Sequence, residues 1–117
     1  WQVQMRGLLP IVAHPERHPE LGRDPKRLRR LVDRGCLLQV TSGSLEGIFG
    51  AGVQSATRRL LREGLVHLLA SDAHNATSRP PHLAKAVALA AEIVGRDSAW
   101  RLAAANPLAV WEDRPIT

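Results

Sequence analysis

The chain has 117 residues, room for one modest domain, and its 44% hydrophobic content is that of a folded globular protein. It contains no apolar run of the roughly 18 residues that a membrane-spanning helix needs and no visible signal peptide, so we expect a cytoplasmic protein without membrane insertion. The net charge of +5 would suit nucleic acid, but no Tyr, one Phe and three Trp leave few rings for base stacking, and we expect no nucleic-acid partner.

The first half of the chain predicts two strands joined by a helix. The first strand covers residues 11–13. The helix starts with Asp24 as N-cap and Pro25 at its first position, where a missing N–H costs nothing, and Gly35 ends it. The second strand covers residues 36–40.

The second half continues this alternation. A Gly-rich loop at residues 41–52 leads into an amphipathic helix that ends at Gly64, and the third strand covers residues 65–70. A longer connection then reaches a proline pair beginning at Pro80, which sets the start of a helix that ends at Gly95.

The last element is a short helix, which we expect Asp97 to cap and Asn106-Pro107 to stop. Alternating apolar strands and helices predict an α/β fold with a parallel sheet under helical cover. A closed βα-barrel needs about 250 residues, whereas this chain offers about three βα units plus a C-terminal helix. It therefore looks like part of a barrel, completed by absent sequence, by another chain or by a rearrangement.

Side chains of the metal-binding type follow two of the predicted strands. His14 comes directly after residues 11–13, and Asp72 and His74 follow residues 65–70. Imidazole and carboxylate ligands together suit manganese, iron or zinc. For the Asp-x-His pair alone, a turn cap and an ordinary polar histidine explain the pattern equally well. The equivalent position of His14 on another strand favours the interpretation as metal ligands.

An arginine follows each of these strand ends at short distance. Arg17 and Arg79 are candidates for phosphate recognition, because a guanidinium group offers a bidentate fork to phosphate oxygens. The alternative is that each arginine pairs with a nearby acid such as Glu16 or Glu20. Taken together, the two arginines favour an anion site.

Three other features of the sequence are expected to have structural rather than catalytic roles. The loop at residues 41–52 lacks the Gly-Lys-Ser/Thr of a nucleotide-binding loop, so we expect it to shape the mouth of a pocket. His67, inside the predicted third strand, is expected to be a hydrogen-bonded core or interface residue. Cys36 is expected to be a small buried hydrophobic residue, and a single cysteine excludes an internal disulfide.

Three segments, taken in order, resemble the CpsB/CapC family: PIVAHPER (10–17), QVTSGSLEG (39–47) and ASDAHN (70–75), the last followed by Arg79-Pro80. Members are bacterial protein-tyrosine phosphatases of the polymerase-and-histidinol-phosphatase (PHP) superfamily. They regulate capsular and exopolysaccharide synthesis by dephosphorylating tyrosine kinases. The resemblance implies a distorted, TIM-like βα-barrel with a cluster of metal ions, usually manganese, that activate water to attack phosphorus.

The resemblance also implies roles for individual residues. His14, Asp72 and His74 match metal-ligand positions, and Arg17 and Arg79 match the catalytic arginines that hold the substrate phosphate. The family's His-x-His motif and bridging Glu are not among these residues. We therefore expect the C-terminal portion of a single phosphatase domain. Such a portion would bind metal weakly, show little activity and self-associate through exposed apolar surface.

Three functional hypotheses remain open. The first is a metal-dependent protein-tyrosine phosphatase that acts on a phosphotyrosine-bearing bacterial kinase, with manganese or another divalent ion such as iron or zinc. The second is another PHP-type phosphoesterase, such as a histidinol phosphatase. The third is a non-catalytic half-barrel that completes its sheet with a partner. The segment at residues 39–47 favours the first.

Overall fold

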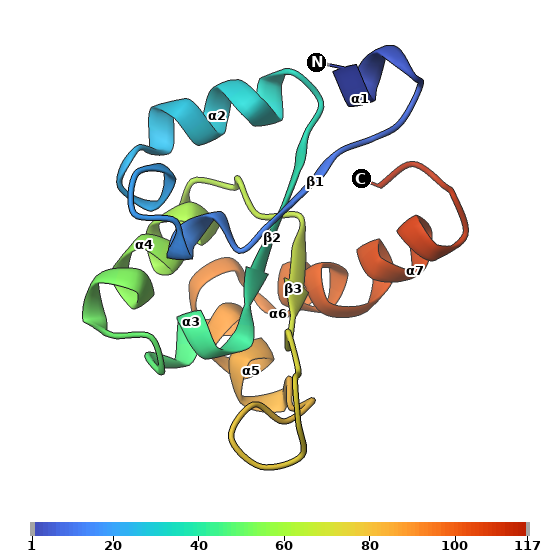
Figure 1. Cartoon of the computed structure of the whole chain (residues 1–117). Coiled ribbons are helices and arrows are strands. Elements are labelled where there is room, and N and C mark those ends of the chain that lie inside the picture. Colours follow the sequence, from blue (N-terminus) through green and yellow to red (C-terminus); the bar gives the residue numbers. More distant parts are fainter. Residues whose placement is uncertain (1, 117) are drawn as a thin grey trace.

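A three-stranded parallel sheet organises the computed structural model, which describes residues 2–116 (Figure 1). The strand order is β1-β2-β3, and the strands are β1 (Ile11–Ala13), β2 (Leu37–Thr41) and β3 (Leu68–Ala70). Ile11 lies opposite Leu37, and Gln39 lies opposite Leu68. Because all three strands run the same way, their carboxyl ends meet at one edge of the sheet. The predicted α/β fold with three parallel strands is confirmed.

Helices follow each strand. In chain order the helical elements are α1 (Gln2–Met5), the 3-10 turns η1 (Pro15–Arg17) and η2 (Leu21–Arg23), α2 (Pro25–Asp33), α3 (Ser42–Glu46), α4 (Ala51–Arg62), α5 (Ala84–Val94), α6 (Arg96–Trp100), the π-helical turn η3 (Arg101–Ala105) and α7 (Asn106–Trp111). The predicted start of α2 is confirmed, since Asp24 accepts a hydrogen bond from the Arg27 amide at 2.9 Å and Pro25 occupies the first turn. None of the described helices is long and apolar enough to cross a membrane.

One face of the sheet carries the hydrophobic core. Leu38, Val40 and Leu69 point into it and are buried against α2, α4 and α5. The opposite face is more open: Ile11 remains 39% exposed, and with Gln39 it lines a hollow of about 330 Å³ in front of η3 and α7. Leu37 and Leu68 point to this same face but are buried, so η3 and α7 cover part of it.

Two boundaries in the middle of the chain differ from the sequence-based expectation. The predicted loop at residues 41–52 contains the helix α3, because the fully buried Leu45 anchors it and Gly47 (φ 89°) ends it. The third strand begins at Leu68 rather than at residue 65. The reason is that the Leu38 N–H donates to the His67 ring nitrogen Nδ1 at 3.1 Å. This side chain takes the place of the backbone carbonyl that would have extended the strand pairing.

The C-terminal expectation was wrong on two points. The helix does not stop at Asn106-Pro107. The π-helical turn η3 leads directly into α7 at Asn106, and Pro107 is tolerated because it falls in the first turn of that helix. Asn106 is buried and its side-chain amide donates to the His67 carbonyl at 2.8 Å. Asp97 does not cap α6; Gly95 is the N-cap, and Asp97 lies in the first turn, where its charge favours the helix dipole.

Candidate active site

Two of the three predicted metal ligands lie at strained turns beyond strand ends. His14 follows β1 with φ 42° and Asp72 follows β3 with φ 51°, both in the left-handed region that non-glycine residues avoid. Such a backbone costs about 1–3 kcal/mol per residue and persists only where the surrounding structure fixes it. The His14 amide is held by the Gln39 carbonyl at 2.8 Å. Strain at these positions marks the carboxyl edge of the sheet as a candidate functional site.

Both predicted arginines converge on the carboxylate of Asp72. Its oxygen Oδ2 accepts from Arg79 Nη2 at 2.5 Å and from Arg17 Nη1 at 3.4 Å. Arg79 Nη2 also donates to the Asp72 main-chain carbonyl at 3.2 Å. Two cations share one carboxylate, so the cluster keeps a net positive charge. The side chains are about a quarter to a third exposed, which leaves the guanidinium groups accessible to an anion.

The alternative pairing of Arg17 with Glu16 or Glu20 is not what the structure shows. Glu20 pairs with Arg27 on the surface. Glu16 is buried, and its Oε1 accepts hydrogen bonds from the Thr41 amide at 3.0 Å and the Thr41 hydroxyl at 3.3 Å. It thus ties the turn that carries Arg17 to the end of β2. Sequence reasoning missed this role, because nothing in the sequence separates Glu16 from a solvent-exposed acid.

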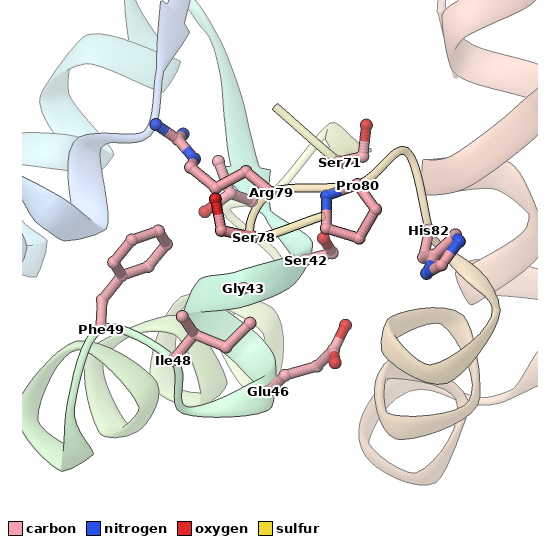
Figure 2. Close-up of a pocket in the computed structure, with 11 residues that line it drawn as sticks. Ser42, Gly43, Glu46, Ile48, Phe49, Ser71, Ser78, Arg79, Pro80 and His82 are labelled. Carbon is pink, nitrogen blue, oxygen red and sulfur yellow. The ribbon is translucent and has the colours of Figure 1, made fainter. Parts of the chain in front are cut away.

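A cavity of about 100 Å³ lies next to Arg79 (Figure 2). Its lining comes from the end of β2 and α3, from the α3–α4 connection and from the loop after β3: Thr41, Ser42, Gly43, Glu46, Ile48, Phe49, Ser71, Ser78, Arg79, Pro80 and His82. Figure 2 shows the ring of Phe49 and the side chain of Ile48 below Arg79. The part of the 41–52 segment that follows α3 therefore forms a pocket wall, as its predicted role requires.

Phe49 is the second candidate functional residue that sequence reasoning missed. The guanidinium carbon of Arg17 lies 3.9 Å from the centroid of the Phe49 ring, and that of Arg79 lies 6.0 Å from it. One signal was available: Phe49 is the only Phe in the sequence, and it stands shortly after the segment at residues 39–47 that carries the family resemblance. A lone aromatic ring in a Gly-rich loop is a candidate binding residue.

The two predicted histidine ligands, unlike the two arginines, do not meet at one point. The His74 ring nitrogen Nδ1 lies 2.7 Å from the Asp72 carbonyl oxygen, which can only accept, so Nδ1 carries a proton; in the neutral ring, Nε2 is then the nitrogen with the lone pair. His14 lines a separate hollow with Arg17, beyond the end of β1. Within residues 2–116, no group of three His, Cys, Asp or Glu side chains lies close enough to hold a metal ion. The donor types suit a metal, but these residues alone do not complete a site.

His67 and Cys36 take no part in this cluster, as expected. Burial lowers the pKa of His67 below 6.5, only partly opposed by a hydrogen bond to the Leu65 backbone. The ring accepts the Leu38 N–H, which requires a neutral imidazole. Cys36 is a buried free thiol. Both are structural residues.

The comparisons with known proteins agree with this architecture. The family model described as "Capsular polysaccharide synthesis, CpsB/CapC" matches residues 1–112. The chain is 42% identical over 87 residues to the tyrosine-protein phosphatase YwqE of Bacillus subtilis, covering 74% of this chain and 34% of the relative. It is 36% identical over 119 residues to the tyrosine-protein phosphatase CpsB of Streptococcus pneumoniae, covering 97% and 49%.

A solved structure gives the same result. A crystal structure from work on YwqE of B. subtilis and CpsB of S. pneumoniae, described as unique metal-dependent tyrosine phosphatases, superposes with a TM-score of 0.91 at 35% identity. The match covers 99% of this chain and 47% of that one, so the chain spans about half the length of these relatives at most. By its sequence and by its structure, the chain belongs to the CpsB/CapC family.

Proposed function

We propose that the protein carrying this chain is a metal-dependent protein-tyrosine phosphatase that regulates capsular and exopolysaccharide synthesis. The observation that supports it best is the convergence of Arg17 and Arg79 on one carboxylate oxygen at the carboxyl edge of the sheet. Two guanidinium groups aimed at a single anionic oxygen are well placed to take a phosphate oxygen instead.

In this proposal Arg17 and Arg79 are the catalytic residues. They bind the non-bridging oxygens of the phosphate monoester, orient phosphorus for attack by water, and stabilise negative charge as the ester bond to the tyrosine oxygen breaks. The products are tyrosine and inorganic phosphate. Asp72 keeps both arginines oriented toward the same point before substrate arrives.

We also propose His14, Asp72 and His74 as three ligands of the metal cluster, with manganese the expected ion and iron or zinc as alternatives. The metal would supply activated water and neutralise phosphate charge. Since the described residues contain no group of three such side chains, further ligands must come from elsewhere. The chain would then be the C-terminal portion of a single PHP-type domain, a distorted TIM-like barrel. The exposed part of the second sheet face, at Ile11, supports this.

The substrate class follows from the cavity beside Arg79. Ile48, Phe49 and Pro80 give it an apolar wall next to a cationic group, which suits an aromatic phosphate ester better than an aliphatic one. A phosphotyrosine on a bacterial tyrosine kinase fits both features, and such a partner would place the protein in the cytoplasm. The non-catalytic half-barrel remains the second candidate, because residues 2–116 hold no three-ligand cluster and leave part of one sheet face exposed at Ile11.

The test compares hydrolysis of a phosphotyrosyl peptide with hydrolysis of histidinol phosphate by the intact protein, in manganese. Faster turnover of the peptide supports the proposal. Faster turnover of histidinol phosphate would contradict the tyrosine phosphatase assignment. The Asp72→Asn variant distinguishes the phosphatase from the non-catalytic half-barrel. In a non-catalytic half-barrel this substitution would change neither the metal content nor the activity.

A further inference from the structure

We propose that Phe49 is a positioning residue that acts through Arg17, by holding the arginine's guanidinium plane so that its N–H edge faces the phosphate site. The proposal rests on the phosphate-binding role of Arg17 given above. In this role Phe49 neither coordinates a metal ion nor touches the reacting atoms.

The first support is the stacking geometry. The Arg17 guanidinium carbon lies 3.9 Å from the Phe49 ring centroid, which places the cation against the ring face. A guanidinium group has its donors around its rim and none on its faces, so stacking occupies a face and leaves the rim free to bind an anion. Arg79 lies farther from the same ring, at 6.0 Å, so its position depends less on Phe49.

The second support is that Arg17 has little else to hold it. Among residues 2–116 its one side-chain hydrogen-bond partner is Asp72, and that contact is long, at 3.4 Å. Arg79, in contrast, makes a 2.5 Å contact with the same carboxylate and a second bond to the Asp72 backbone. The two arginines are therefore fixed by different means: Arg79 by hydrogen bonds and Arg17 mainly by the aromatic ring.

The third support is the close approach of the Phe49 ring to α3. A Cβ added at Gly43 would come within 3.0 Å of the Phe49 ring carbon Cε2, so the ring approaches the backbone of α3 closely. Gly43 has an ordinary helical backbone and is buried, so the absent side chain rather than a special φ angle explains glycine here. Phe49 thus contacts both the backbone of α3 at Gly43 and the side chain of Arg17 from η1, and the contact with α3 limits movement of the ring.

The test measures binding of inorganic phosphate to the intact protein that carries this chain by calorimetry, together with the Arg17 Nε–H resonance by NMR. Phe49→Leu keeps an apolar side chain but removes the ring, and should weaken phosphate binding about 3- to 30-fold. Phe49→Tyr keeps a ring face and should bind like the wild type. The ring-current shift of the Arg17 resonance should be present in wild type and Phe49→Tyr and absent in Phe49→Leu.

A double variant shows whether Phe49 acts through Arg17. In an Arg17→Gln background, Phe49→Leu should cause no further loss of phosphate affinity, because the group it positions is gone. Equal affinities of wild type and Phe49→Leu would overturn the inference, as would a loss that is the same size in the Arg17→Gln background. If wild type itself binds no phosphate, the proposed phosphate site fails as well, and the inference fails with it.

Discussion

The buried carboxylate of Glu16 provides the sharpest prediction about stability. In Glu16→Ala the buried Thr41 N–H loses its acceptor, which costs about 1–3 kcal/mol. The lost side-chain methylene adds about 0.8 kcal/mol. The Thr41 hydroxyl keeps Ser44 as a partner at 2.6 Å, so it adds little. The other carboxylate oxygen, Oε2, is buried without a hydrogen-bond partner among the described residues, so its removal offsets about 1 kcal/mol of this loss. The free energy of unfolding should therefore fall by about 1–3 kcal/mol.

The assay is urea and thermal unfolding followed by circular dichroism, where this loss corresponds to a fall in Tm of about 4–12 °C. Glu16→Gln keeps an acceptor oxygen but loses the charge, and should cost only about 1 kcal/mol. Glu20→Ala is the matched control: it lies in the same turn region, its side chain is 77% exposed, and it should change stability by less than about 0.5 kcal/mol. A Glu16→Ala variant as stable as Glu20→Ala would refute the reasoning.

Three further predictions concern the site and the core. Arg79→Ala should lower kcat/KM for a phosphotyrosyl peptide about 100-fold or more in the intact protein, because a fixed donor to the phosphate is lost; a change below about 3-fold would contradict its role. Asp72→Asn should lower the bound manganese measured by elemental analysis as well as the activity, and unchanged metal content would remove Asp72 from the ligand set. Burial lowers the folded-state pKa of His67, so the unfolded chain binds more protons, and stability should fall as pH drops below 6.5 toward that lower pKa. The urea midpoint should show this fall in wild type and in the exposed-site control His82→Gln, but a smaller one in His67→Gln; equal pH dependence in all three would contradict it.

Local sequence patterns predicted the parallel sheet, and the carboxyl ends of β1 and β3, correctly. The apolar run before His14, and the Asp24-Pro25 pair at the start of α2, act within a few residues and need no knowledge of distant contacts. Parallel strands then bring residues from separate parts of the chain to one edge. This is why the strand pattern alone was enough to expect Arg17 and Asp72, 55 positions apart, near each other.

The features that could not be predicted depend on packing at longer range. Helix α3 forms in a Gly- and Ser-rich stretch because Leu45 is buried, a tertiary effect that overrides local propensity. The ring of Phe49 reaches Arg17 only because Gly43 leaves room for it. The His67 ring accepts the N–H of Leu38 in β2, so β3 begins later in the chain than predicted. Each depends on a partner that no sequence window around the residue contains.

The most direct test of the proposed function is the rate of phosphotyrosyl-peptide hydrolysis by the intact protein that carries this chain. It is measured in manganese, after chelation, and after manganese is restored. We expect turnover that the chelator abolishes, that manganese restores, and that Arg79→Ala lowers whenever manganese is present. Turnover that persists in the chelator, or no turnover in manganese by a folded wild-type protein, would contradict a metal-dependent tyrosine phosphatase.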